Sequence, residues 1–174
     1  LRRAGGTPVT LPGSEIFTAL QTGAIDATEW VGPYNDASFG LHKAAKYYYY
    51  PGWHEPGPGL ETIINQDAWN ALPPDLQEIV RTTCQAITAD MAAEYTHGNA
   101  TSLERLQQDP NVEIRPFPPE VIKLLRSIAQ EVVDELMAAD PAAAKIGKAY
   151  FDYLDLVARN GRLSEQAYLN TREY

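Results

Sequence analysis

Apolar residues recur every three or four positions through the second half of the chain, which predicts long amphipathic helices. The first is expected to start at Pro73-Pro74, because proline is favoured in the first helical turn. Its apolar positions form one row: Leu76, Val80, Cys84, Ile87, Met91 and Tyr95. A second helix is expected from Pro118-Pro119, and a third from about Ala142 to Arg159, closed by Asn160-Gly161. One face of each helix is therefore expected to be buried.

The opening third of the chain alternates between strand-like and helix-like segments. Residues 7–11 and 25–31 are predicted strands, and Ser14 is the expected N-cap of a helix over residues 15–22. This order predicts a strand-helix-strand crossover of a parallel sheet. Residues 37–50 read as a helix or a helix-strand transition.

Two further short segments have the β-branched character or alternation of a strand. They are residues 60–64 and residues 112–116. The fold class is therefore α/β, with an α/β segment over residues 1–66 followed by a mostly helical region over residues 67–174.

Composition narrows the class of partner. A net charge of −9 with 14 scattered basic residues argues against nucleic acids and anionic membranes. The single cysteine, Cys84, excludes an internal disulfide and is expected to be a buried thiol on the helical row. No apolar run approaches the ~18 residues of a membrane span. The start, Leu1 to Gly6, reads like the end of a helix closed by glycine, which predicts that the chain lacks its natural front end.

Two carboxylates lie where predicted strands run out into glycine- and proline-rich loops. Glu29 precedes Trp30 and a Gly-Pro turn, and Glu55 follows Trp53 and His54. Because ligands of α/β folds gather at strand ends, both carboxylates are expected to reach one cation. Such hard oxygen donors suit Na⁺, Mg²⁺ or Ca²⁺. The alternative is that both carboxylates are ordinary solvated side chains.

Aromatic side chains surround these carboxylates in the sequence. Trp30, Tyr34 and Trp53 are candidates both for a ligand pocket and for core packing. Of the four tyrosines at 47–50, two are expected to face the core and two the ligand or solvent, because a strand alternates its faces. His54 beside Glu55 is a plausible general base, yet no serine or cysteine nucleophile in a suitable setting accompanies it.

Three stretches of the sequence resemble the periplasmic solute-binding proteins of TRAP (tripartite ATP-independent periplasmic) transporters. They are LPGSEIFTALQTGAIDATEWVGPYND at 11–36, GLHKAAKYYYYPGWHEPGPG at 40–59 and NQDAWNALP at 65–73. The nearest branch binds 2-oxo acids such as pyruvate, or lactate and related 2-hydroxy acids. The resemblance covers most of the chain and weakens toward its end.

The resemblance implies the C-terminal portion of a two-lobed periplasmic binding protein with long C-terminal helices. In that branch a cation such as Na⁺ or Ca²⁺ binds the ligand's oxygens. Carried onto this sequence, the metal ligands are the side chains of Glu29 and Glu55 and the backbone carbonyl of Trp30. Trp30, Tyr34, Trp53 and His54 then line the ligand. The family's N-terminal glutamine and arginine ligands have no counterpart here.

The functional prediction is a carrier, not an enzyme. It captures a small 2-oxo or 2-hydroxy carboxylate in the periplasm and passes it to the membrane subunits of a TRAP transporter. The resemblance also implies a homodimer, because the 2-oxo acid branch exchanges C-terminal helices between chains. The alternative is a metal-dependent hydrolase or lyase that acts on a small carboxylate with His54 as base. The sequence leaves open which acid and which cation bind.

Overall fold

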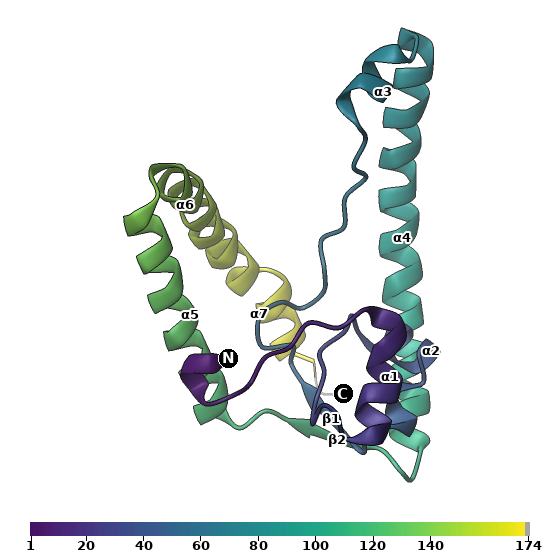
Figure 1. Ribbon diagram of the computed structural model, residues 1–174, viewed down its shortest axis with the longest axis vertical. Helices are drawn as coiled ribbons and strands as arrows, with labels where there is room; N and C mark the ends of the chain where they lie inside the picture. The colour runs from purple at the N-terminus through teal and green to yellow at the C-terminus, as the bar shows by residue number, and fades with distance from the viewer. Residues whose placement is uncertain (173–174) are drawn as a thin grey trace. The chain divides into compact units, whose positions relative to one another are not determined.

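The computed structural model describes residues 1–172 (Figure 1). The chain divides into two compact units, one formed by Leu1–Thr7 with Pro119–Tyr174 and the other by Pro8–Pro118. These units follow spatial compactness. The division of the chain into residues 1–66 and 67–174 stays a prediction. Among the helices of the described residues, none has the length and apolar character needed to cross a membrane.

The larger unit, Pro8–Pro118, contains the sheet and most of the short elements. In chain order its elements are α1 (Gly13–Thr22), α2 (Pro33–Ser38), the 3₁₀ turn η2 (Leu41–Lys43), β1 (Tyr47–Tyr50), α3 (Gln66–Ala71), α4 (Pro74–Gln108) and β2 (Glu113–Pro116). β1 and β2 pair in parallel, with Tyr48 opposite Ile114. Helices α3 and α4 lie between them in the chain, as the crossover of a parallel pair requires. The predicted strand at 112–116 and the helix-strand transition before residue 50 are confirmed.

The core of this unit is a small apolar cluster beneath α1. Ile16, Leu20 and Leu41 are buried there, and the indole of Trp30 packs against them. Helix α2 lies across the C-terminal half of α4, where Gly98 leaves room for the ring of Tyr34. A Cβ at Gly98 would lie 2.8 Å from that ring, so the close approach of the two helices requires a glycine here.

Several predicted strands are absent from the described residues. Segments 7–11, 25–31 and 60–64 have no regular structure, so the early strand-helix-strand crossover was wrong. A segment becomes a strand only when another strand accepts its hydrogen bonds, and these segments have no such partner in residues 1–172. The capping prediction was also wrong: α1 starts at Gly13 with Pro12 as N-cap, which places Ser14 inside the first turn.

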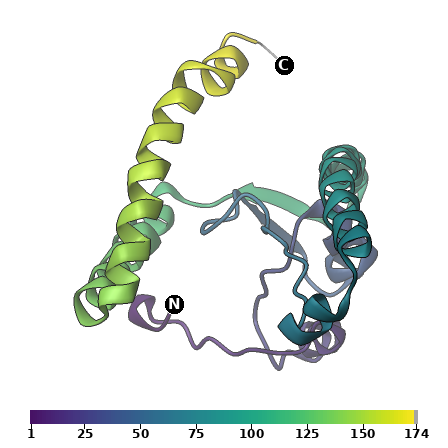
Figure 2. The same cartoon turned by 90° about the horizontal axis from the view of Figure 1, so that it is seen from above.

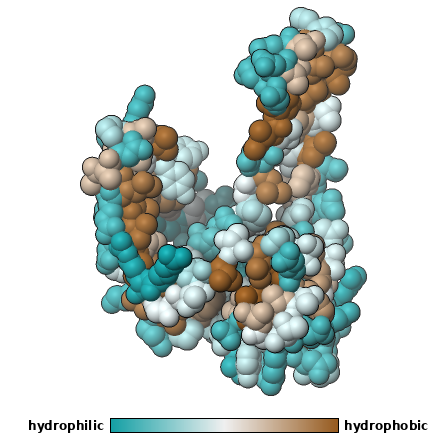
Figure 3. Space-filling model, viewed as in Figure 1, coloured by the Kyte–Doolittle hydropathy of each residue, from teal (hydrophilic) through white to brown (hydrophobic). Residues whose placement is uncertain are grey.

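Helix α4 has two different surroundings along its length. In its C-terminal half Gly98, Ser102 and Leu106 are buried. In its N-terminal half the expected burial of the apolar row was wrong for Leu76 and Ile87, which are exposed, while Cys84 is half-buried beside Thr62. Figure 3 shows this hydrophobic surface over the upper part of the helix.

The smaller unit is helical. It contains the 3₁₀ turn η1 (Arg2–Ala4), α5 (Pro119–Ala139), α6 (Pro141–Leu163) and α7 (Glu165–Asn170). The long helices α5 and α6 form a hairpin, seen in Figure 2, in which Met137 packs on Gly147. Arg3 of η1 donates two hydrogen bonds to Glu135 of α5, at 2.9 and 2.6 Å, which raises the pKa of the guanidinium and lowers that of the carboxyl.

The structure tests three sequence expectations for these helices. Starts at Pro119 and close to Ala142 are confirmed, because proline and the Asp140 side-chain cap define them locally. The predicted stop at Asn160-Gly161 was wrong, since α6 continues to Leu163 and Gly161 does not adopt the left-handed conformation of a C-cap. The expectation of a buried face also fails within this unit, where Leu136, Ile146 and Tyr150 are exposed.

The contrast along α4 generates a prediction. Leu106→Ala, in the 174-residue chain, should lower the free energy of unfolding by about 2–5 kcal/mol, because Leu106 is only 3 % exposed and its removal leaves a cavity. Ile79→Ala on the same helix, where Ile79 is 58 % exposed, should change it by no more than about 0.5 kcal/mol. Urea denaturation measures both, and equal losses would contradict the division of α4.

Candidate functional site

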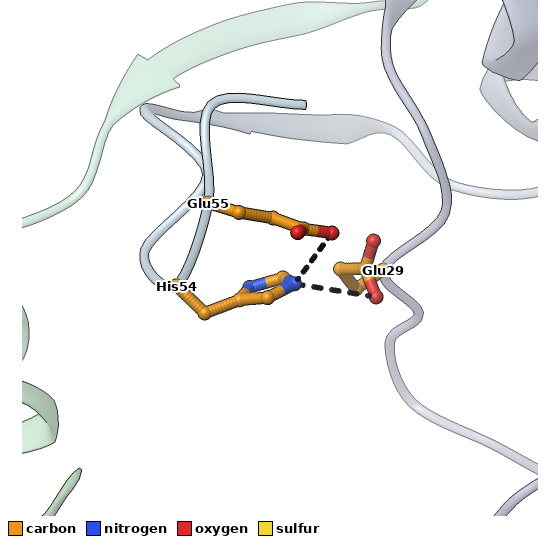
Figure 4. Close-up of side chains that lie close together, drawn as sticks. All are labelled: Glu29, His54 and Glu55. Atoms are coloured by element: carbon orange, nitrogen blue, oxygen red, sulfur yellow. Dashed lines mark ion pairs between the residues drawn. The ribbon is translucent and has the colours of Figure 1, made fainter. Parts of the chain in front are cut away.

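Three titratable side chains from two distant segments meet on the larger unit. Glu29, His54 and Glu55 each offer a ligand atom, and these atoms lie within 4.8 Å of one another (Figure 4). The Nε2 atom of His54 stands 3.8 Å from Glu29 Oε2 and 3.5 Å from Glu55 Oε1. All three are partly open to solvent, with side chains 57, 32 and 43 % exposed in that order. The cluster can therefore be reached from outside.

Glu29 is held by its neighbour. The indole of Trp30 inserts beneath α1, where its ring centroid is 5.0 Å from that of Phe39. A Cβ at Gly13 would lie 2.7 Å from this indole, so the first residue of α1 must be small. The partly buried ring anchors an otherwise irregular segment and so fixes the place of Glu29. The role of the Trp30 backbone carbonyl as a metal ligand stays a prediction.

His54 and Glu55 lie in the loop that follows β1. Gly52 packs directly on the backbone carbonyl oxygen of Glu55, which closes residues 52–55 into a tight turn. The ring of Trp53 lies 5.0 Å from the imidazole of His54, tilted by 52°. The turn directs His54 and Glu55 to the same side, toward Glu29 (Figure 4).

Two carboxylates and one imidazole form a group of atoms that could hold a cation. Two carboxylates so close together repel one another, and a cation between them removes this repulsion. Carboxylate and carbonyl oxygens favour Na⁺, Mg²⁺ or Ca²⁺, whereas an imidazole is a better ligand for transition metals. His54 forms ion pairs with both glutamates only when its ring carries a second proton. A neutral His54 can instead donate one hydrogen bond to a bound anion.

Tyr34, the one remaining predicted site residue, packs against α4 instead. The amide of Tyr34 donates to Asn99 of α4 at 3.0 Å, and its hydroxyl donates to Glu94 at 3.0 Å, which raises the pKa of the phenol. In the described residues no recorded contact joins Tyr34 to the three-residue cluster. Its place in a ligand site stays a prediction.

Of the four tyrosines in β1, Tyr48 alone is half-buried, so the expectation that two would face the core was wrong. Its hydroxyl donates to Asp36 at 2.6 Å. Asp36, buried at the C-terminal side of the Gly-Pro turn, was not singled out from the sequence. An aspartate a few residues after a turn is common in protein sequences. Its position in the sequence does not show that its partner is the hydroxyl of Tyr48.

The site offers little for nucleophilic catalysis. In the described part of the chain no serine or cysteine is recorded within hydrogen-bonding distance of His54, and Cys84 contacts Thr62 instead. A general base without a protein nucleophile could act only by taking a proton from water or from the substrate itself.

Comparison with known proteins identifies the family of this chain. The family described as bacterial extracellular solute-binding protein, family 7, matches residues 1–140, and the chain belongs to this family. The chain is 37 % identical over 170 residues to a monocarboxylate 2-oxoacid-binding periplasmic protein of Nostoc sp., a match that covers 98 % of this chain and 46 % of the relative. Family membership confirms the predicted resemblance to solute-binding proteins. It gives no support to a hydrolase or lyase.

Solved structures agree with the family assignment. TRAP periplasmic solute-binding proteins from Colwellia psychrerythraea, with bound calcium and pyruvate, and from Pseudoalteromonas atlantica, with bound sodium and pyruvate, each match with a TM-score of 0.92 and 40 % identity. The matches cover 98 and 99 % of this chain and 52 % of each of those chains. The predicted fold class is confirmed, and the chain spans about half the length of these relatives.

A third solved structure, from Bordetella bronchiseptica, is 32 % identical with a TM-score of 0.92, over 97 % of this chain and 50 % of its own. It is described as a mixed-occupancy dimer with copurified calcium and picolinate in one site and an apo second site. The ligand in that protein is again an organic carboxylate accompanied by a cation.

The turn that carries Glu55 can be tested by one methyl group. Gly52→Ala should lower the free energy of unfolding by about 1–3 kcal/mol, because the added Cβ would collide with the Glu55 carbonyl and force the turn open. Gly57→Ala, in the same loop but with no atom within 4 Å of the added Cβ, is the control and should be nearly neutral. Chemical denaturation compares the two, and a neutral Gly52→Ala would contradict the tight turn.

Proposed function

We propose that this protein is the periplasmic solute-binding component of a TRAP transporter, and that it binds a small 2-oxo or 2-hydroxy monocarboxylate through a cation. The protein would release the acid to the transporter's membrane subunits. The chain spans about half the length of its relatives, so the remainder of the protein would supply the other side of the ligand shell.

The observation that carries this proposal is the convergence of Glu29 and Glu55. They are 26 positions apart in the sequence, yet their oxygens share one small region with His54. The two neighbours with pyruvate contain calcium or sodium, the cations that the oxygen donors of this site favour. The relative from Nostoc sp. is described as binding monocarboxylate 2-oxoacids, which are ligands of the same class.

Charge balance explains why a cation is needed. A monocarboxylate approaching two ionised glutamates would be repelled, and the net charge of −9 adds to that repulsion. A divalent cation neutralises both carboxylates and keeps unfilled coordination positions for the oxygens of the acid. The carboxylate and the adjacent oxo or hydroxy group of the ligand can then bind the cation together, which selects for 2-oxo and 2-hydroxy acids.

Each residue of the site has a role in this proposal. Glu29, Glu55 and the backbone carbonyl of Trp30 hold the cation. His54 donates a hydrogen bond to the organic anion, and Trp53 covers its apolar part. The ring of Trp53 excludes water and so strengthens the electrostatic contacts around the ion.

Calorimetry of the entire gene product with pyruvate and Ca²⁺ tests the proposal. Pyruvate should bind in the presence of Ca²⁺ or Na⁺ and lose at least about tenfold in affinity when the cation is chelated or replaced by a large organic cation. Absence of binding heat for pyruvate and for lactate under every cation condition would contradict the proposal.

Glu29→Gln should weaken cation and acid together, by about tenfold or more, because one ionised oxygen donor is lost. Glu104→Gln removes the same charge from an exposed position on α4 and should leave both affinities unchanged. Unchanged pyruvate affinity in Glu29→Gln would place the ligand elsewhere.

The homodimer belongs to this proposal as well. Helix α6 carries an exposed apolar row of Ile146, Tyr150, Tyr153 and Val157, at 70, 61, 66 and 39 % exposure within this chain. The row follows helical spacing, so it forms one face. The structure from Bordetella bronchiseptica is described as a dimer, which supports a second copy as the partner of this face.

Light scattering at micromolar concentration should therefore give a dimeric mass. A double substitution, Ile146→Glu with Tyr153→Glu, should shift the protein to the monomer, because it places charges in an apolar interface. Lys145→Glu, at an exposed neighbouring position, should remain dimeric. A monomeric wild-type mass would contradict the dimer.

A further inference from the structure

The buried carboxylate of Asp36 links the two segments that form the candidate site. Asp36 is 9 % exposed and accepts three hydrogen bonds within the larger unit. Its Oδ1 accepts from the backbone amides of Val31, at 3.3 Å, and Gly32, at 3.2 Å. Its Oδ2 accepts from the Tyr48 hydroxyl at 2.6 Å. In the described residues it forms no ion pair, so these donors are what compensate the burial of the carboxylate.

The first link determines where the Trp30 carbonyl points. The amide nitrogen of Val31 and the carbonyl of Trp30 belong to the same peptide group, which is planar with its N–H and C=O directed oppositely. Asp36 draws the N–H toward itself and thereby directs the carbonyl oxygen the other way. A carboxylate that accepts from the N–H also polarises the peptide and increases the negative charge on its carbonyl oxygen.

The second link reaches the other segment. Tyr48 lies in β1, held in register opposite Ile114, and Glu55 follows five residues after the end of the strand at Tyr50. Burial and the hydrogen bond to Asp36 both raise the pKa of the Tyr48 phenol, so its proton is available to Asp36 at any physiological pH. One carboxylate thus connects the Glu29-Trp30 segment to the strand that leads into the Glu55 turn.

We propose that Asp36 and Tyr48 are positioning residues of the cation site: together they orient the Trp30 carbonyl and set the separation of the Glu29 and Glu55 segments. This inference rests on the proposed function, because it assigns these residues to the same site. Hydrogen-bonding partners of metal ligands orient the ligands, and their loss typically costs 10–100-fold in metal affinity.

A purely structural role is the competing explanation. Asp36 lies in the first turn of α2 and its side chain accepts from the amide of Gly32, the N-cap residue, so it could serve only to stabilise that helix. In that case its substitution would reduce stability and leave the folded protein with normal cation affinity. The two explanations therefore differ in the affinity of the folded protein.

The test measures Ca²⁺ affinity by calorimetry on the entire gene product, at a temperature where circular dichroism shows each variant folded. Tyr48→Phe should weaken Ca²⁺ binding by about tenfold, because Asp36 loses its connection to β1. Asp36→Ala should weaken it by about 10–100-fold. Asp36→Asn keeps an acceptor for the two amides and should recover part of that loss. If Asp36→Ala does not fold, Tyr48→Phe and Asp36→Asn decide the matter.

Leu106→Ala is the control for lost stability, since Leu106 is buried in the same unit and makes no contact with the cluster recorded among residues 1–172. It should bind Ca²⁺ as the wild type does. Wild-type affinity in Tyr48→Phe and Asp36→Asn, with binding lost in Glu29→Gln, would overturn the positioning role and leave the proposed function intact. Absence of Ca²⁺ binding and of cation-dependent pyruvate binding in the wild type would overturn both.

Discussion

The repulsion between two carboxylates that the fold holds together is the constraint on which the site depends. Glu29 and Glu55 would separate if their segments were free, because nothing in the described residues bridges them except the imidazole of His54. Their separation must therefore be maintained by contacts outside the cluster. A site in which like charges are held close is preorganised for a cation, because folding has already brought the ligands together and binding need not do so.

The contacts that hold the two segments differ in kind. The Glu29 segment is held by apolar burial of the Trp30 indole, and the Glu55 turn is held by the close approach of Gly52 to a carbonyl. Hydrogen bonds to Asp36 connect the first segment to β1. Trp30 illustrates two roles proposed for one residue: its side chain packs against the core, while its backbone carbonyl is the proposed cation ligand.

Two apolar helix faces are exposed within this chain. The N-terminal half of α4 and the face of α6 are amphipathic by sequence, yet within this chain they lie open. An amphipathic helix gains most of its stability from covering its apolar face. The chain spans about half the length of its relatives. Large exposed apolar patches are typical of surfaces that bind another protein or another part of the chain.

The sequence by itself determined the long helices that begin at Pro74 and Pro119, because apolar periodicity and N-terminal proline are local signals. The sequence also predicted that Glu29 and Glu55 bind the same cation, because long stretches around them resemble one family. Only the tertiary structure decided which extended segments become strands, since a strand requires a partner that its own residues do not specify. The same holds for Asp36: its bond to a tyrosine twelve residues away depends on how β1 packs, which residue spacing does not encode.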